Sequence, residues 1–153
     1  MSHQRPFFVI VPGASLTFLH YVELTGLLME AGYPRRVPEL PSDGGSSSTV
    51  SVEDDAKFIR EKILLPLPDR QQKNIILLTH GYSSIPGSAA AKGLSKAERA
   101  DSGKQTGVIA QIHVAGILTK GGDGRSVVDV FDGRYPLQMT PDVSINDGRL
   151  HVF

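Results

Sequence analysis

The sequence contains no cysteine and no tryptophan, and its 16 basic residues are balanced by 16 acidic ones. The lack of cysteine excludes disulfides, thiolate zinc sites and a cysteine nucleophile. A net charge of zero argues against nucleic-acid and anionic-membrane partners, because both need clustered positive charge. Long apolar runs are also missing: the N-terminal run, residues 7–11, is too short for a signal peptide or a membrane span. We therefore expect a soluble cytoplasmic protein that binds neither nucleic acid nor membrane.

Three short apolar runs are present, at residues 7–11, 75–78 and 108–118. Their hydrophobicity is continuous rather than alternating, which is typical of parallel strands buried on both faces. A short strand is expected at residues 36–40. The chain of 153 residues suits one domain or slightly more.

Segments with helical spacing separate these runs. One apolar stripe comprises Tyr21, Leu24, Leu28 and Ala31, and a second comprises Val52, Ala56, Ile59 and Ile63. Gly32 is placed to end the first helix, and Ser51 with Asp54 to cap the start of the second. Pro66 and Pro68 are expected to end the second helix. This alternation predicts an α/β fold, a mostly parallel sheet flanked by helices.

The pattern changes after residue 118. Glycine-rich residues 121–124 predict a turn, residues 127–131 and 150–153 predict small strands, and residues 146–148 (Asn-Asp-Gly) predict a hairpin turn. We expect a core at residues 1–120 and a β-hairpin appendage at residues 121–153. The Gly/Ser-rich stretch 42–49 predicts a loop.

Two strand ends are candidates for the functional site, because ligands of open α/β sheets bind beyond the carboxyl ends of the strands. The first is the turn Gly13-Ala14-Ser15, and the second is Gly81-Tyr82 at the start of a small-residue helix. Their backbone N–H groups are suited to binding a carbonyl or enolate oxygen. The alternative is that the first turn merely connects a strand to a helix.

The chain resembles the α/β-hydrolase superfamily, in particular a fungal and bacterial branch with a VPGA turn and an HSYGG nucleophile elbow. The resemblance rests on segments in the expected order: PFFVIVPGAS, ELTGLLMEAGY, VPELPS, VEDDAKFIREKI, NIILLTHGYSS, GSAAAKGLSKAER and GVIAQIHVAGIL. It implies the N-terminal half of an α/β-hydrolase fold, with residues 121–153 as the start of the cap region.

The elbow departs from the family pattern G-x-S-x-G. Thr79 and Ser83 replace the two glycines, and Gly81 stands at the position of the nucleophilic serine. Since glycine has no side chain, a standard Ser-His-Asp mechanism cannot start there. Ser83 or Ser84 is an alternative, displaced nucleophile, although Ser83 is expected to cap the helix. His80 is either a base or, as is ordinary at this elbow position, structural.

The family's remaining strands, catalytic acid and C-terminal histidine have no counterpart before the chain ends. His113 is expected to be a core histidine, and the other candidates (His3, His20 and His151) lie in poor positions for a base. No aspartate can be assigned as the orienting acid. The sheet would keep an open edge, which we expect to be covered by a second copy, by a separate chain, or by the rest of a longer chain.

No metal or cofactor is expected. Asp123, Asp129 and Asp132 lack the spacing of an EF-hand, and Gly103-Lys104 lacks the other residues of a P-loop. Three functions stay open. The first is non-hydrolytic chemistry (lyase, isomerase or cyclase type) on a small apolar carbonyl metabolite, of the polyketide type met in secondary metabolism. The second is a non-catalytic subunit or pseudoenzyme, and the third is a hydrolase that uses Ser83.

Overall fold

A computed structural model describes residues 4–44, 50–118, 143–146 and 149–152 of the chain. Two compact units are distinguished, Met1–Gly116 and Ile117–Phe153. The first holds a parallel sheet with its helices, and the second holds an antiparallel hairpin of β5 (Val143–Asn146) and β6 (Arg149–Val152). Strand β6 overlaps the small strand predicted at residues 150–153, whereas residues 147–148 of the predicted hairpin turn lie outside the described part. The boundary expected near residue 120 stays a prediction, because residues 119–142 lie outside the described part.

The first unit alternates strands and helices, as predicted. The strands are β1 (Phe7–Val11), β2 (Arg35–Arg36), β3 (Ile75–His80) and β4 (Val108–Val114). The helical elements are η1 (Phe18–Tyr21), α1 (Val22–Glu30), η2 (Pro41–Gly44), α2 (Val52–Phe58), η3 (Ile59–Leu64), α3 (Pro66–Arg70), η4 (Gly81–Ser83), α4 (Ser84–Ala91) and α5 (Lys96–Ala100). None of the helices in the described ranges is long and apolar enough to cross a membrane.

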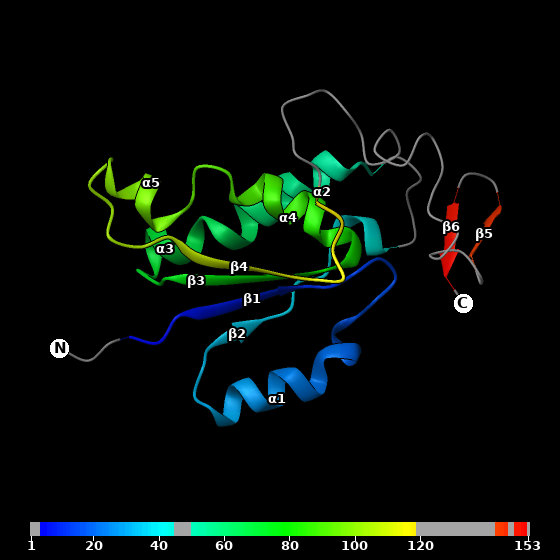
Figure 1. The fold of residues 1–153 in the computed structure, drawn as a ribbon, viewed down its shortest axis with the longest axis horizontal. Helices are drawn as coiled ribbons and strands as arrows, with labels where there is room; N and C mark the ends of the chain where they lie inside the picture. The colour runs from blue at the N-terminus through cyan, green and yellow to red at the C-terminus, as the bar shows by residue number, and fades with distance from the viewer. Residues whose placement is uncertain (1–3, 45–49, 119–142, 147–148, 153) are drawn as a thin grey trace. The chain divides into compact units, whose positions relative to one another are not determined.

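The sheet has the strand order β2-β1-β3-β4, and all its strands are parallel. Helix α1 lies on one face, and α2, α3 and α4 lie on the other (Figure 1). After β1, the chain adds β2 on one side of β1. It then crosses over and adds β3, followed by β4, on the other side. The order therefore reverses between β1 and β3, and their carboxyl ends flank the crevice where ligands of such sheets bind.

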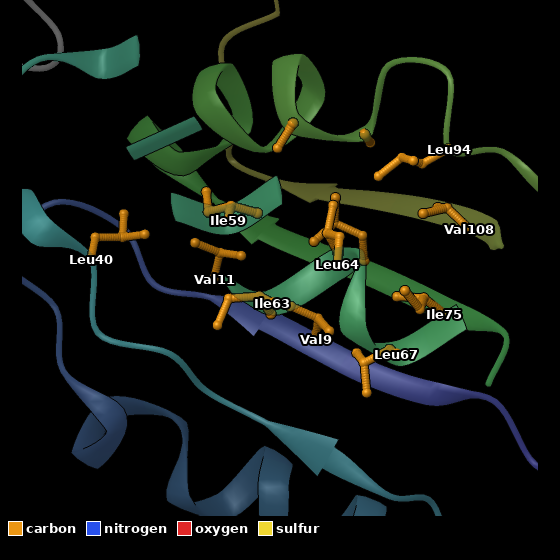
Figure 2. Packing of buried hydrophobic residues seen from close by; sticks show 13 residues of the cluster. Val9, Val11, Leu40, Ile59, Ile63, Leu64, Leu67, Ile75, Leu94 and Val108 are labelled. Carbon is orange, nitrogen blue, oxygen red and sulfur yellow. The ribbon is translucent and has the colours of Figure 1, made fainter. Parts of the chain in front are cut away.

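The larger hydrophobic core lies between the sheet and the α2–α4 side (Figure 2). Strand residues such as Val9, Val11 and Leu77 are fully buried against Ile59 and Leu64 of the helical layer. A smaller cluster of Ile10, Tyr21 and Leu78 forms on the α1 face. Because β1 and β3 place apolar side chains on both faces, their continuous apolar runs are required by the fold. The predicted fold class is confirmed.

The helix ends follow the sequence signals at two points. Gly32 has φ +75°, the left-handed conformation that glycine adopts readily after a helix. At the start of α2, Asp54 N–H donates to Ser51 Oγ at 3.2 Å, and Ser51 N–H donates back to Asp54 Oδ2 at 2.9 Å. Both caps were predicted.

Three boundaries differ from prediction. The helix expected to stop at Pro66 continues as π-helical η3 and then α3, because Pro66 occupies the first position of α3, where no N–H is needed. Strand β2 covers only Arg35–Arg36 instead of residues 36–40, since Pro38 has no N–H to donate to a neighbouring strand. Strand β4 ends at Val114, before Ala115 turns the chain with φ +47°.

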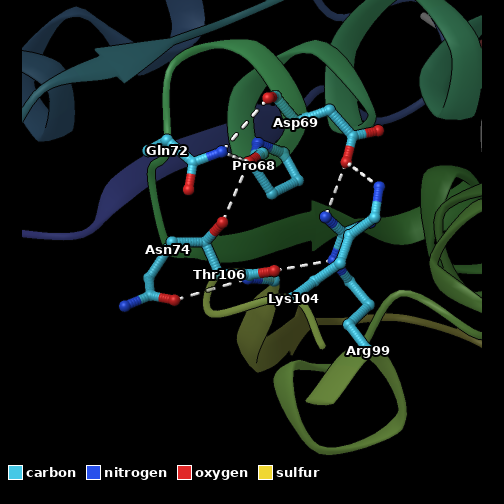
Figure 3. Close-up of polar contacts among 8 residues, drawn as sticks. Pro68, Asp69, Gln72, Asn74, Arg99, Lys104 and Thr106 are labelled. Atoms are coloured by element: carbon cyan, nitrogen blue, oxygen red, sulfur yellow. Dashed lines mark hydrogen bonds and ion pairs between the residues drawn. The ribbon is translucent and has the colours of Figure 1, made fainter. Parts of the chain in front are cut away.

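A polar network fastens the amino-terminal end of the sheet, opposite the crevice (Figure 3). Asp69 Oδ1 accepts hydrogen bonds from Arg99 Nη2 and Lys104 Nζ, both at 2.7 Å. Arg99, which is buried, also donates through Nε to the Thr106 carbonyl at 2.6 Å. The hydrogen bonds and charges of these two cations hold the pKa of Asp69 below its ordinary value. Lys104 therefore belongs to this network, which joins α3, α5 and the loop before β4.

Asp69→Asn should lower stability at neutral pH and not in acid. A carboxylate whose folded pKa is depressed stabilises the fold above its unfolded pKa, and this contribution is lost as pH falls through the folded pKa. Since Asp69 is partly exposed, we expect a loss of about 1 kcal/mol in the free energy of unfolding at pH 7. Urea titrations at pH 7 and at about pH 2 measure it. Asp101→Asn, on the exposed end of α5, is the control, and equal losses at both pH values would contradict the assignment.

Candidate functional site

The crevice between the ends of β1 and β3 brings the two predicted site segments together. Parallel pairing sets Val11 beside Thr79, so the turn after β1 and the elbow after β3 emerge at the same edge. Gly13 lies against His80: a Cβ added to Gly13 would come within 3.2 Å of the His80 carbonyl oxygen. This distance is shorter than an ordinary van der Waals contact, so a side chain at residue 13 would require the two segments to move slightly apart.

The elbow has a sharp strand–turn–helix shape without a nucleophile at its tip. His80 is extended, and Gly81 then adopts φ +55°, a left-handed conformation that side chains rarely take up. Apart from its two neighbours in the chain, no described residue has an atom within 4 Å of the position that a Cβ on Gly81 would occupy. The tip of the elbow therefore points into open space, and a side chain there would be free to meet a ligand.

Ser83 is a structural residue in this geometry. It is fully buried, its Oγ donates to the Val11 carbonyl at 2.8 Å, and it accepts from the His80 N–H at 3.1 Å. These bonds tie the elbow to the end of β1. A hydroxyl that is buried and engaged on both sides is poorly placed to attack a substrate.

Tyr21 connects the two segments across the crevice. Its Oη accepts a hydrogen bond from the Gly13 N–H at 3.1 Å and lies 2.8 Å from His80 Nδ1. Burial raises the pKa of Tyr21, which keeps its hydroxyl protonated. The direction of its hydrogen bond to His80 Nδ1 depends on the imidazole tautomer: when Nδ1 carries the proton it donates to the Tyr21 hydroxyl, which can then donate its own proton to a ligand. The sequence assigned Tyr21 to an apolar helix stripe, and its spacing gave no sign of this polar role.

A buried carboxylate holds the elbow helix from the other side. Asp55 is fully buried and accepts hydrogen bonds from Tyr82 Oη at 2.9 Å, Ser42 Oγ at 2.6 Å and Ser42 N–H at 3.1 Å. Burial and the bond to Asp55 raise the pKa of Tyr82 well above its ordinary value. In the sequence, Asp55 is one of three acidic residues in the first turn of its helix, a pattern that explains it as a complement to the helix N-terminus.

Asp43 is a second carboxyl group beside the predicted oxyanion turn. Its Oδ2 accepts a hydrogen bond from the Leu40 N–H at 3.3 Å, and the backbone amide of Ser15 lies nearby. Burial first, and the nearby charge of Asp55 as well, raise the pKa of Asp43 above its ordinary value. Both effects favour the protonated acid, so this group is suited to giving and taking a proton. The sequence placed Asp43 in a glycine-rich loop and offered no signal for it.

The predicted oxyanion turn is thus partly engaged within the protein. The Gly13 N–H donates to Tyr21 Oη, and the Ser15 amide lies near the Asp43 carboxyl group. The turn itself is closed by a hydrogen bond from the Leu16 N–H to the Gly13 carbonyl at 3.0 Å. A ligand oxygen would have to share or replace these partners, or use the amides of Tyr82 and Ser83 at the start of the helix.

His113 lies on the other face of the sheet from His80. Its Nδ1 is 2.8 Å from Thr79 Oγ1, which also lies 3.1 Å from Ser84 Oγ. Thr79 and Ser84 are fully buried. His113 therefore has the satisfied structural contacts expected of a core histidine, although it remains partly exposed at the sheet edge.

Clusters of three or more potential metal ligands are missing from the part of the chain that the structure describes. The predicted solvated turn with Asp123, Asp129 and Asp132 lies outside that part, as does the strand expected at residues 127–131. The chemical groups of the site are therefore hydroxyls, carboxyls, one imidazole and backbone amides.

Comparison with known proteins supports the fold. No protein-family model and no curated protein sequence matches the chain. An extracellular α/β-hydrolase from a Paenibacillus species, described as homologous to tobacco salicylic acid binding protein 2, matches with a TM-score of 0.55 and 20% identity, over 81% of this chain and 45% of its own. A mutant of polyneuridine aldehyde esterase matches with a TM-score of 0.65 and 14% identity, over 96% of this chain and 56% of its own. The chain has part of an α/β-hydrolase fold and spans about half the length of each structure.

Asp55→Ala should destabilise the protein strongly. The substitution leaves Tyr82 Oη and the two Ser42 donors without their buried acceptor, and each unsatisfied buried group costs about 1–3 kcal/mol. We expect a loss of at least about 2 kcal/mol in the free energy of unfolding, measured by urea titration. Glu53→Ala, on the exposed side of the same helix, is the matched control. Equal stabilities of the two variants would show that the Asp55 contacts contribute little.

Proposed function

We propose that the protein is an α/β-hydrolase-like enzyme that works without a nucleophile, by proton transfer on a small apolar carbonyl compound. The observation that carries this proposal is Gly81: the elbow keeps a left-handed turn at its tip, with open space beyond it and no side chain to attack a substrate. A covalent acyl intermediate cannot form at this position. Chemistry of the lyase, isomerase or cyclase type needs no such intermediate.

Enolisation of a carbonyl compound is the step that this site is suited to perform. A base removes the proton from the carbon next to the carbonyl, and an acid gives a proton to the carbonyl oxygen, so that keto and enol forms interconvert without a further reactant. Asp43 in its ionised form is the proposed base. The Tyr21 hydroxyl, which His80 can reprotonate, is the proposed acid, and the amides of Tyr82 and Ser83 would hold the oxygen.

The groups around the crevice support this assignment. Asp43 and Tyr21 interact electrostatically; Tyr21 bonds to the Gly13 amide, and Asp43 lies near the Ser15 amide of the same turn. An acid and a base on either side of one carbonyl are the arrangement that enolisation requires. Esters or β-keto compounds with small apolar substituents are the proposed substrate class, and the proposed location is the cytoplasm.

Exchange of the carbon-bound proton tests the proposal directly. The protein, incubated in D2O with small β-keto compounds, should speed up deuterium incorporation beside the carbonyl, followed by NMR. Asp43→Asn should lower this rate by about 100-fold or more, because general acid–base groups contribute about 10²–10⁴-fold. Glu39→Gln, a neighbouring carboxyl change on an exposed residue, is the control. Exchange at the background rate, or equal rates for Asp43→Asn and the wild type, would contradict the proposal.

A fluorophosphonate probe separates this function from serine hydrolysis. We expect no labelling of the wild-type protein, since Gly81 has no hydroxyl and Ser83 is buried. Gly81→Ser should fold at a cost of about 1–2 kcal/mol for the left-handed backbone, because nothing obstructs its Cβ; thermal unfolding measures this cost. Labelling of the wild type that Ser83→Ala abolishes would instead support a displaced serine nucleophile.

A binding protein without turnover is the second candidate. The observation in its favour is that the Gly13 amide already has a partner within the protein, the Tyr21 hydroxyl. A pseudoenzyme of this kind would bind β-keto compounds in calorimetry and leave their proton exchange unchanged. The two measurements together distinguish it from the enzyme.

A further inference from the structure

Asp55 joins two segments of the crevice that lie far apart in the sequence. Its Oδ1 accepts a hydrogen bond from the Ser42 N–H at 3.1 Å. Its Oδ2 accepts one from the Ser42 hydroxyl at 2.6 Å and another from the Tyr82 hydroxyl at 2.9 Å. Ser42 belongs to η2, the turn that carries Asp43, and Tyr82 belongs to η4 at the elbow. One buried carboxylate therefore fastens both segments at the same time.

The turn that carries Asp43 is anchored at two points. Leu40, just before the turn, is buried in the larger core, and its N–H donates to Asp43 Oδ2. The two bonds from Ser42 to Asp55 are the second anchor, and they lie directly beside Asp43 in the chain. Weakening these bonds would therefore let Asp43 move relative to the elbow.

Charged and titratable groups surround Asp43 from the neighbouring elements. Asp55 of α2 and Glu39 of the preceding loop are the nearby negative charges. Tyr21 of η1 and Tyr82 of η4 also lie close enough to interact with the charge of Asp43. Burial is the largest cause of the raised pKa of Asp43, and the charge of Asp55 adds to it. The pKa of Asp43 thus reports how near Asp55 is held.

We propose that Asp55 is a positioning residue for enolisation, which holds Asp43 at a fixed distance from the elbow amides through its bonds to Ser42 and Tyr82. This inference rests on the proposed function, in which Asp43 removes the proton and the elbow amides hold the substrate oxygen. Because Asp55 is fully buried, it acts through these neighbours and does not touch the substrate. A misplacement of about 1 Å can lower a rate by about 100-fold, so a rigid link between base and oxygen site affects turnover.

An NMR titration of the Asp43 carboxyl group tests the link without any substrate. Asp55→Asn keeps the shape of the side chain and removes its charge. The pKa of Asp43 should fall in this variant, because a nearby negative charge raises the pKa of a carboxyl group. Glu53→Gln, the same kind of change on an exposed residue of α2, is the control and should leave the pKa of Asp43 unchanged. Circular dichroism verifies that both variants fold. The same pKa of Asp43 in Asp55→Asn and in the wild type would overturn the proposal.

Deuterium exchange of a small β-keto compound tests the effect on turnover. Ser42→Ala and Tyr82→Phe each remove one bond to Asp55 and keep the backbone amides of the elbow. Each should lower kcat by about 10–100-fold, with KM little changed, because the groups that bind the substrate remain. Tyr33→Phe, which removes the hydroxyl of a tyrosine packed on Phe8, is the control and should keep the wild-type kcat.

The outcomes separate this inference from the function on which it rests. Wild-type kcat in both Ser42→Ala and Tyr82→Phe, with exchange by the wild type above background, would overturn the positioning role and leave the proposed function standing. Exchange at the background rate by the wild type would contradict the proposed function, and the positioning role with it.

Discussion

The parallel pairing of β1 with β3 is the constraint on which the candidate site depends. Five consecutive residue pairs, from Phe7 with Ile75 to Val11 with Thr79, fix the register of the two strands. Their buried side chains fill the core on both faces, so a slip of the register would expose apolar residues. The chain segments after Val11 and Thr79 must therefore emerge side by side. The Ser83 hydroxyl, bonded to the Val11 carbonyl, fastens this end.

At the carboxyl ends of β1 and β3, two polar side chains, Asp55 and Tyr21, connect the surrounding segments by hydrogen bonds. Asp55 reaches the elbow through Tyr82 and the loop before α2 through Ser42. Tyr21 reaches the β1 turn and His80. Because a buried polar group without a partner is costly, these contacts are required for stability as well as for any chemistry. Substitutions in the crevice will thus affect folding and function together unless, like Asp43→Asn, they keep the shape of the side chain.

The fold alone does not determine the reaction. The two similar structures are described as an α/β-hydrolase and an esterase, and their likeness to this chain extends over part of their length at low identity. One fold supports many reactions, so activity has to be argued from the groups of the site. Here the elbow without a side chain and the acid–base groups around it favour proton transfer. The same lack of a nucleophile also fits a protein that binds without turnover.

The sequence by itself determined the order of the strands and helices, the two caps at Gly32 and Ser51, and the position of the elbow, because these depend on local patterns of apolar spacing and backbone preference. The prediction that Pro66 ends the helical segment was wrong, because the proline begins a new helix, α3, directly after η3. The sequence could not find Asp43, Asp55 or Tyr21, which are separated in sequence from the elbow and resemble ordinary loop, cap and core residues. Only the tertiary structure brought them together, because the crossover connections around β1 and β3 converge on the same ends of the strands.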